Sequence, residues 1–273
     1  MKDVTFGQYF PVKSFVHKMD ARIKILLSIA YIVAVFLVRG STTFHFAGFG
    51  VCLLFVLTAT ILAKVPFMRV LGSIKGIIFF VLFSAILQIF FNESGTPLWK
   101  GGFITTGGLI SAGFITARIT LIILGASLLT LTTSPVEIAD GIESLLLPLK
   151  YIKFPVHEFA LIMSIALRFI PTLLDETDRI MKAQKARGAD FDSKNLFKKA
   201  KALIPVLIPL LISSFRHADD LADAMDARCY SGSKNRTKFK KLRLSYRDLL
   251  GTLVVAGLIV GIVFLNKIWG ITP

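Results

Sequence analysis

The sequence is poor in charged residues for a chain of 273, and poorest in acidic ones. Asp, Glu, Lys and Arg make up 18% of it, whereas soluble domains contain about a quarter. Only 17 acidic residues oppose 32 basic ones, while 54% of the residues are hydrophobic and the mean hydropathy is +0.71. This composition indicates a membrane protein, in which the excess of Lys and Arg marks the cytoplasmic side and not a nucleic-acid surface.

Cysteine, histidine and nucleotide-binding motifs are also scarce or missing. The two cysteines, Cys52 in an apolar stretch and Cys229 in a basic one, provide no disulfide framework. The pair His157-Glu158 begins like a zinc-protease motif, but Leu161 occupies the place of the second histidine. No G-x-x-x-x-G-K-[ST] sequence is present, so we expect no ATP binding by this chain, no metal site and no cofactor.

Five apolar stretches are long enough to cross a bilayer, which takes about 20 residues of helix. They are residues 23–38, 44–63, 70–91, 107–131 and 249–269. The basic N-terminal segment is not followed by an A-x-A-like cleavage site, so we expect the first stretch to be a retained helix.

Two further stretches, residues 159–174 and 202–215, are nearly as apolar, and counting both would give seven crossings instead of five. A charge and several prolines make them poor spans, namely Arg168, Pro171, Pro205 and Pro209. With seven crossings, residues 179–201 would form the most basic external loop of the chain. That segment contains Arg179, Lys182, Lys185, Arg187, Lys194, Lys198, Lys199 and Lys201.

The positive-inside rule therefore favours five crossings, with the basic N-terminus inside and the C-terminus outside. We expect an all-α polytopic membrane protein in three parts. Residues 1–131 hold the N-terminal cytoplasmic segment and four transmembrane helices, residues 132–248 form a cytoplasmic helical domain, and residues 249–273 hold the fifth transmembrane helix and the external C-terminus. The two apolar cytoplasmic stretches then need a membrane or protein surface to cover them.

The cytoplasmic part has clear helix signals. Ser134 and Glu137 form a capping box with Pro135 in the first turn, which predicts a helix start. A second helix is predicted from residue 156 to Gly188, apolar in its first half and charged in its second, with Pro171 kinking or splitting it where the character changes.

Residues 195–229 repeat this plan at an offset of 41 positions. The offset places Arg187 on Arg228, and each arginine follows an alanine and precedes a small residue. Small neighbours let a guanidinium enter a narrow groove, where its planar fork suits a carboxylate. An ordinary basic helix end that contacts lipid phosphates is the simpler explanation for one such motif, but two matched motifs favour docking to a partner.

Arg118 lies near the middle of the fourth expected span, where a charge is costly. One explanation is a paired or water-lined position that matters for subunit contact. The other is that the helix tilts or starts late, so that Arg118 reaches an interior polar group.

Three stretches resemble one family, the transmembrane T component of energy-coupling factor (ECF) transporters, called EcfT. They are GQYFPVKSFVHKMDARIKI (7–25), TTSPVEIADGIESLLLPLK (132–150) and, most specifically, FPVHEFALIMSIALRFIPTLLDETDRIMKAQKARGADF (154–191). The paired Ala-Arg-Gly motifs of that family fall on Ala186-Arg187-Gly188 and Ala227-Arg228-Cys229. Cys229 stands where glycine is usual, and because cysteine disfavours a positive φ, the glycine-type turn is not secured there.

The resemblance implies a scaffold subunit in the plasma membrane of a prokaryote, which is not itself an enzyme, within an ATP-driven importer of vitamins and other micronutrients. It implies that two ABC-type ATPases bind the two arginine motifs at the tips of long coupling helices. It also implies that a small membrane protein, the S component, captures the substrate, so this chain does not determine which substrate is carried. The apolar bodies of the coupling helices would form the platform for the S component, with the expected contacts Phe159, Leu161, Ile162, Ile165, Phe169, Leu203, Leu207, Leu210 and Leu211.

Two other classes of function start from the same spans. A stand-alone secondary carrier or channel with membrane-surface helices usually has polar residues or broken helices along a pathway through its spans, whereas the prolines here cluster in the cytoplasmic part. An intramembrane enzyme needs acids, histidines or metal ligands that converge within the spans, and the five stretches lack them.

Overall fold

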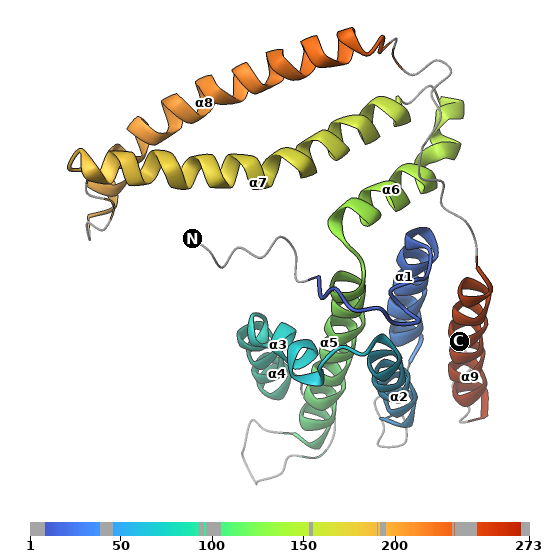
Figure 1. The fold of residues 1–273 in the computed structure, drawn as a ribbon. Helices are drawn as coiled ribbons and strands as arrows, with labels where there is room; N and C mark the ends of the chain where they lie inside the picture. The colour runs from blue at the N-terminus through green and yellow to red at the C-terminus, as the bar shows by residue number, and fades with distance from the viewer. Residues whose placement is uncertain are drawn as a thin grey trace. The chain divides into compact units, whose positions relative to one another are not determined.

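The computed structural model describes residues 9–38, 46–92, 96, 105–152, 155–189, 191, 195–230, 232 and 245–268. The chain is all-helical, as the sequence predicts (Figure 1). The helices are α1 (Ala21–Leu37), α2 (Phe46–Ala63), α3 (Phe67–Lys75), α4 (Ile78–Phe91), α5 (Thr106–Thr132), α6 (Pro135–Leu146), the 3-10 helix η2 (Leu147–Ile152), α7 (Val156–Ala186), α8 (Leu196–Ala227) and α9 (Tyr246–Ile268). Outside the described residues lie positions 44, 45 and 269, at the ends of the second and fifth expected spans, and the side chain of His157.

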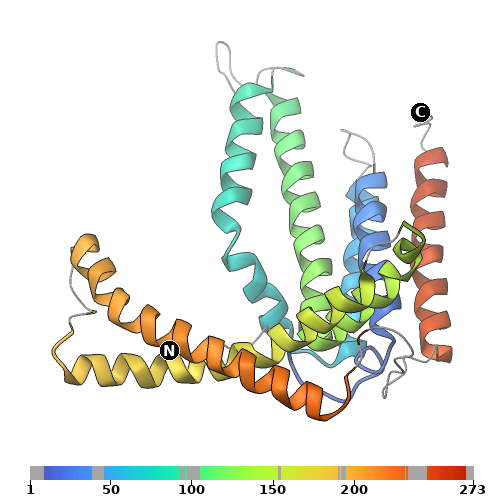
Figure 2. The ribbon, with the colours of Figure 1, turned by 90° about the horizontal axis from the view of Figure 1, so that it is seen from above.

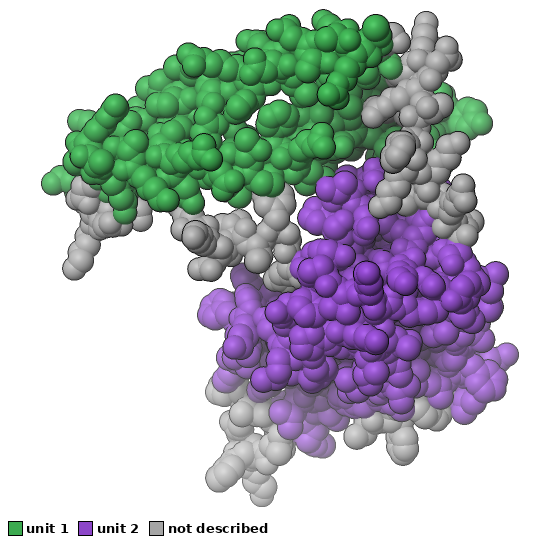
Figure 3. Space-filling model, viewed as in Figure 1, with its two compact units in different colours: residues 1–6, 142–241 green, residues 7–141, 242–273 purple. Residues whose placement is uncertain are grey.

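The chain packs as two compact units (Figure 3). The bundle unit comprises residues 7–141 and 242–273, and therefore α1 to α5, the first part of α6, and α9. The helix-pair unit comprises residues 1–6 and 142–241, and therefore the end of α6, η2, α7 and α8.

The bundle unit contains the helices that match the five predicted crossings. α2, α5 and α9 are each long and apolar enough to cross a membrane, and α3 and α4 qualify together as one pair bent by 62°. α1 matches the first predicted crossing in position, but with 17 residues and a length of about 25 Å it is too short to pass the same test. In the helix-pair unit, residues 200–227 of α8 also pass this test of length and composition, but only 6% of their apolar window is buried, against 33% in α2 and in α5.

The third predicted crossing is broken and not one straight helix. α3 ends at Lys75 and α4 begins at Ile78, with Gly76 between them. Glycine costs a helix interior about 1 kcal/mol relative to alanine, so ending the helix beside Gly76 costs less than at most other residues.

The two helices that contain prolines in the helix-pair unit are continuous. α7 runs through Pro171, which was predicted to kink or split the helix and does not split it, and α8 runs through Pro205 and Pro209. The predicted capping box at the start of α6 is present, because the Glu137 backbone N–H donates to Ser134 Oγ at 3.3 Å and the Ser134 N–H donates to the Glu137 carboxylate at 3.4 Å.

The core of the bundle unit is built around Tyr31 of α1. Its ring stacks on Phe55 of α2 with 5.4 Å between ring centroids, and its hydroxyl donates to the Leu121 carbonyl of α5 at 3.2 Å. A Cβ at Gly125 would overlap the Tyr31 ring, so only glycine permits this approach of α1 to α5. Other buried side chains around Tyr31 are Ala34, Val35, Cys52, Val56, Leu124, Leu258 and Ile262.

A buried carboxylate joins the start of α9 to the start of α1. Asp248 is 3% exposed and accepts hydrogen bonds from the backbone N–H of Asp20 at 2.8 Å and of Ser245 at 2.7 Å. Asp20 in turn caps α1 by accepting from the N–H of Arg22 at 3.0 Å. One side chain therefore satisfies backbone donors on two segments that are more than two hundred residues apart in sequence.

The segment before α1 is held against the end of α5. The Lys24 ammonium donates to the carbonyls of His17 at 3.2 Å and Thr132 at 3.1 Å, and the Phe10 N–H donates to the Leu131 carbonyl at 3.0 Å. The His17 ring bonds to the Phe10 carbonyl at 2.9 Å, and partial burial lowers the pKa of His17 below its usual value.

These contacts fix the direction of the helices in the bundle unit (Figure 2). The starts of α1 and α9 lie at the same end as the finish of α5. At the other end, the Asn266 amide of α9 donates to the Leu37 carbonyl of α1 at 2.8 Å. α1 and α9 are thus parallel to each other and antiparallel to α5, as successive membrane crossings require.

The Gly125 contact leads to a stability prediction. Replacing Gly125 with alanine forces the Tyr31 ring to move, so we expect Gly125→Ala to destabilise the chain by about 1–3 kcal/mol. Gly257→Ala in α9 is the matched control, because a Cβ there meets nothing within 4 Å and the change improves helix propensity. Thermal unfolding in detergent measures both, and equal midpoints for the two variants would contradict the close packing.

The Asp248 contacts lead to a second prediction. Asp248→Ala leaves two buried backbone N–H groups without an acceptor, and we expect a loss of about 2–4 kcal/mol. Asp248→Asn keeps one acceptor oxygen and should lose less. Thermal unfolding and limited proteolysis of the segment before α1 check this order, and an alanine variant as stable as the parent would refute it.

Candidate functional site

The two candidate arginines occupy the same position on their helices. Ala186 is the last residue of α7 and Ala227 the last residue of α8, and Arg187 and Arg228 cap the C-termini with φ of −86° and −94°. We call the last residues of each helix and its cap the α7 tip (178–188) and the α8 tip (219–229).

The α7 tip ends in a Schellman motif, in which two backbone N–H groups turn back to carbonyls that the helix leaves free. The Ala189 N–H donates to the Gln184 carbonyl at 3.0 Å, and the Gly188 N–H donates to the Lys185 carbonyl at 3.0 Å. Gly188 has the positive φ of 88° that this motif requires.

The α8 tip repeats the same motif at the same offset of 41 positions. The Tyr230 N–H donates to the Met225 carbonyl at 3.0 Å, and the Cys229 N–H donates to the Asp226 carbonyl at 2.9 Å. Cys229 has a φ of 57°. It therefore adopts the glycine-type turn, although cysteine disfavours a positive φ and the sequence did not predict this turn. A left-handed residue other than glycine costs about 1–2 kcal/mol, which places backbone strain beside Arg228.

Both tips are open to a partner. All six motif residues are exposed, which are Ala186, Arg187, Gly188, Ala227, Arg228 and Cys229. The alanine before each arginine has a small side chain, so it does not prevent the guanidinium from entering a narrow groove. The negative end of the helix dipole also favours the positive charge of the arginine.

α7 and α8 pack against each other in antiparallel directions. Glu176 of α7 accepts a short hydrogen bond from Ser213 Oγ, and its other carboxylate oxygen lies 3.5 Å from Nε2 of His217. The His217 ring lies 6.0 Å from that of Phe169. Residues later in α7 therefore meet residues earlier in α8.

A side chain from α7 also fills a gap that proline leaves in α8. Pro209 has no N–H to donate to the carbonyl of Pro205 four residues earlier. The Gln184 amide donates to that carbonyl instead, at 3.4 Å. Gln184 lies within the α7 tip, three residues before Arg187, and 23 residues separate Pro205 from Arg228. The two arginines therefore lie on the order of 35 Å apart, at opposite ends of the pair (Figure 1).

The candidate platform residues differ in how far they are exposed on this pair. Exposed ones are Phe159, Ile162, Leu203, Leu207 and Leu211, and half-buried ones are Leu161, Ile165, Phe169 and Leu210. The exposed set leaves an uncovered apolar surface on both helices.

Arg118 reaches an interior polar group. Its guanidinium donates to the Val38 carbonyl at 2.8 Å and lies 4.8 Å from the ring centroid of Phe114 and 5.7 Å from that of Phe36. Val38 directly follows α1, so Arg118 supplies a donor at the end of that helix, as the second of the two explanations requires.

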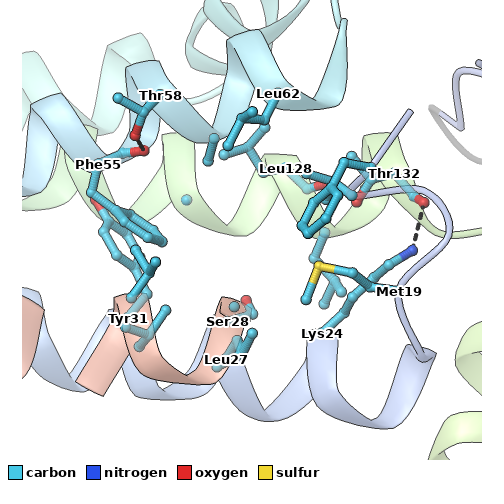
Figure 4. Close-up of a pocket in the computed structure, with 18 of the residues that line it drawn as sticks. Met19, Lys24, Leu27, Ser28, Tyr31, Phe55, Thr58, Leu62, Leu128 and Thr132 are labelled. Carbon is cyan, nitrogen blue, oxygen red and sulfur yellow. Dashed lines mark hydrogen bonds between the residues drawn. The ribbon is translucent and has the colours of Figure 1, made fainter. Parts of the chain in front are cut away.

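The bundle unit contains an apolar cavity of about 390 Å³ (Figure 4). Tyr31, Phe55, Leu62 and Leu128 are among the residues that line it, and the Lys24 ammonium lies at one end, bonded to the Thr132 carbonyl. None of the candidate residues lines this cavity. Within the described ranges, no three His, Cys, Asp or Glu side chains lie close enough to hold a metal ion.

Sequence reasoning found both tips but missed the contacts that position them. The signals were present in Glu176, Gln184 and His217, polar residues within amphipathic helices, but their partners lie on another helix and no local pattern identifies them. The basic residues near the N-terminus were interpreted as a mark of the cytoplasmic side, but one of them, Lys24, has a buried ammonium that bonds to two carbonyls.

Comparison with known proteins agrees with the resemblance seen in the sequence. Residues 12–239 match the cobalt transport protein family, CbiQ. The chain is 50% identical over 272 residues to the energy-coupling factor transporter transmembrane protein EcfT of Clostridium kluyveri, which covers 98% of each chain. It is 49% identical to the protein of the same name from Ruminiclostridium cellulolyticum over 92% of this chain and 93% of the relative, and 44% identical to that of Bacillus subtilis over 95% and 96%.

The spanning helices and these relatives define the class as a multi-pass membrane component of a transporter. Within that class, the chain belongs to the family of energy-coupling factor transporter transmembrane proteins, EcfT.

The two Schellman motifs lead to a prediction about local stability. Cys229→Gly removes the left-handed strain, so we expect the end of α8 to gain about 1 kcal/mol. Gly188→Ala adds strain at the matched position and should weaken the end of α7 by a similar amount. Hydrogen exchange of the backbone amides at positions 229 and 230, and at 188 and 189, which donate the bonds of the two motifs, measures both changes. Unchanged exchange at the α8 tip in Cys229→Gly would contradict the strain.

Proposed function

We propose that this chain is the non-catalytic scaffold of an ECF-type micronutrient importer, and that its two tips dock two ABC-type ATPase subunits. The observation that carries the proposal is the matched pair of exposed, arginine-capped Schellman ends on one antiparallel helix pair. A left-handed turn is common at helix ends, so the support comes from its combination with an exposed arginine between small residues at both ends of the pair.

The chemistry of the tips supports docking into a groove. Arg187 and Arg228 each extend a helix end as a single planar cation with small neighbours, which fits a narrow cleft that contains a carboxylate. We expect the groove of each ATPase to contain an acidic side chain, so each arginine would lose its hydration water and pair with that acid on docking. Losing one partner of such a pair costs binding about 2–5 kcal/mol.

The exposed apolar residues of α7 and α8 support a second partner in the membrane. Phe159, Ile162, Leu203, Leu207 and Leu211 present aliphatic and aromatic surface that water does not cover favourably. We assign this surface to the substrate-binding S component, in line with the resemblance to EcfT. The charge bias of the sequence supports a cytoplasmic N-terminus and cytoplasmic tips, facing the ATPases.

The proposed mechanism is mechanical coupling. ATP binding and hydrolysis bring the two ATPases together and apart, and each ATPase holds one tip. Because the tips are at opposite ends of a packed helix pair, their relative movement changes how α7 lies against α8. That change shifts the apolar surface and turns the S component between substrate-accepting and substrate-releasing orientations.

The docking role leads to a prediction about charge reversal. We expect Arg187→Glu and Arg228→Glu each to weaken ATPase binding by about 2–5 kcal/mol, and the double variant to abolish uptake, because a carboxylate cannot pair with an acidic groove. Arg216→Glu is the matched control, an exposed arginine of α8 about 18 Å before Arg228 along the helix.

The measurement is ATPase recovery on the tagged chain together with uptake of a vitamin by whole cells. A double variant that transports at the parental rate, or a control that fails equally, would refute the docking role.

A further inference from the structure

The two tips share a backbone but reverse their charge, position by position. At the offset of 41, Arg179 matches Asp220, Lys182 matches Asp223 and Lys185 matches Asp226, while Arg187 matches Arg228. Residues 178–187 carry four basic and one acidic residue, whereas residues 219–228 carry one basic and four acidic ones. The α7 tip therefore has a net charge of +3 and the α8 tip a net charge of −3.

All three pairs of reversed positions lie on the surface. The six side chains are exposed, and on each helix they recur every third residue, so they follow one another along one side of the last turns before the arginine. A partner that holds Arg187 or Arg228 in a groove would meet these side chains at the groove's edge.

Helix stability does not account for the acidic set. A basic residue in the last turn of a helix is stabilising, which accounts for Lys185, whereas Asp226 in the last turn of α8 opposes the helix dipole. Among the described residues, no cation forms a salt bridge with Asp220, Asp223 or Asp226. The α8 tip thus carries three acidic charges that no described salt bridge neutralises, the last of them at a place where a basic residue would stabilise the helix.

We propose that these three matched positions make the tips select two different ATPase subunits. The α7 tip takes the subunit whose groove has an acidic edge, and the α8 tip takes the subunit whose groove has a basic edge around the acid that receives Arg228. The inference rests on the docking role proposed above and adds the residues that decide which subunit goes where. Complementary charges speed the correct encounter and like charges penalise the exchanged one, so the complex has one fixed orientation.

The chain offers a direct probe of this orientation. Cys229 is exposed at the α8 tip, and the other cysteine, Cys52, is buried. A photoactivatable thiol-reactive crosslinker on Cys229 therefore reports the subunit bound to the α8 tip. The double variant Gly188→Cys with Cys229→Gly moves the reactive thiol to the matched position of the α7 tip, where the same left-handed turn exists.

The experiment uses the whole complex, purified with its own ATPases from native membranes, and mass spectrometry identifies the crosslinked subunit. We expect the thiol at 229 and the thiol at 188 to label different ATPases, each with a preference of about tenfold. If the thiols at 229 and 188 label the same ATPase to the same extent, the selection is wrong, while the docking role is still supported. Labelling of no ATPase from either position would instead overturn the docking role.

A charge-exchanged variant tests the cause of the selection. It combines Arg179→Asp, Lys182→Asp and Lys185→Asp with Asp220→Arg, Asp223→Lys and Asp226→Lys, so the net charge of the chain is unchanged. We expect the labelled subunits to exchange between the two thiols. Labelling that keeps its original pattern in an intact complex would show that other features choose the subunits and would overturn the inference.

Discussion

The antiparallel packing of α7 against α8 is the constraint on which both arginines depend. Glu176 bonds to Ser213 and lies 3.5 Å from His217 one turn further on, while the Gln184 amide donates to the carbonyl that Pro209 leaves free. Sliding one helix by a turn would break these contacts together, and each hydrogen bond contributes about 0.5–1.5 kcal/mol. The bonds therefore fix the register, and the register places Arg187 and Arg228 at opposite ends of one stiff pair.

The same contacts give the prolines a role beyond breaking helices. A proline inside a helix removes one donor and normally bends or ends the helix. In α8 the unpaired carbonyl becomes an acceptor for the neighbouring helix, so a local defect turns into a specific contact between helices. Backbone strain lies instead at the C-terminal end of α8, where Cys229 adopts a left-handed turn next to Arg228, the residue that we assign to docking.

Local patterns were sufficient for much of this fold and for part of the site. Apolar runs predicted the crossings, the Ser134–Glu137 spacing predicted a helix start that is present, and the alanine-arginine repeat located both tips. The break after Lys75, the left-handed Cys229 and the buried bonding of Lys24 were not predictable. The bonding of Lys24 depends on Thr132, 108 residues away in sequence, and propensity and periodicity do not register such a partner. The turn at Cys229 is held by local bonds to Met225 and Asp226, but cysteine disfavours a positive φ and so gives no signal for it. Glycine occurs inside α3, at Gly72, as well as at the break, at Gly76, so propensity does not locate the break. The platform residues, the three-part division and the side of the membrane stay predictions.

The shortness of α1 has a consequence for the lipid around it. Its 17 residues extend about 25 Å, whereas the hydrocarbon layer of a bilayer is about 30 Å thick. Leu26, Ile29, Val33 and Phe36 face outward along it, so acyl chains must shorten there to match. Such hydrophobic mismatch carries an elastic cost that falls when another short protein lies alongside. The mismatch therefore favours, beside α1, a neighbouring protein whose own hydrophobic length is also short.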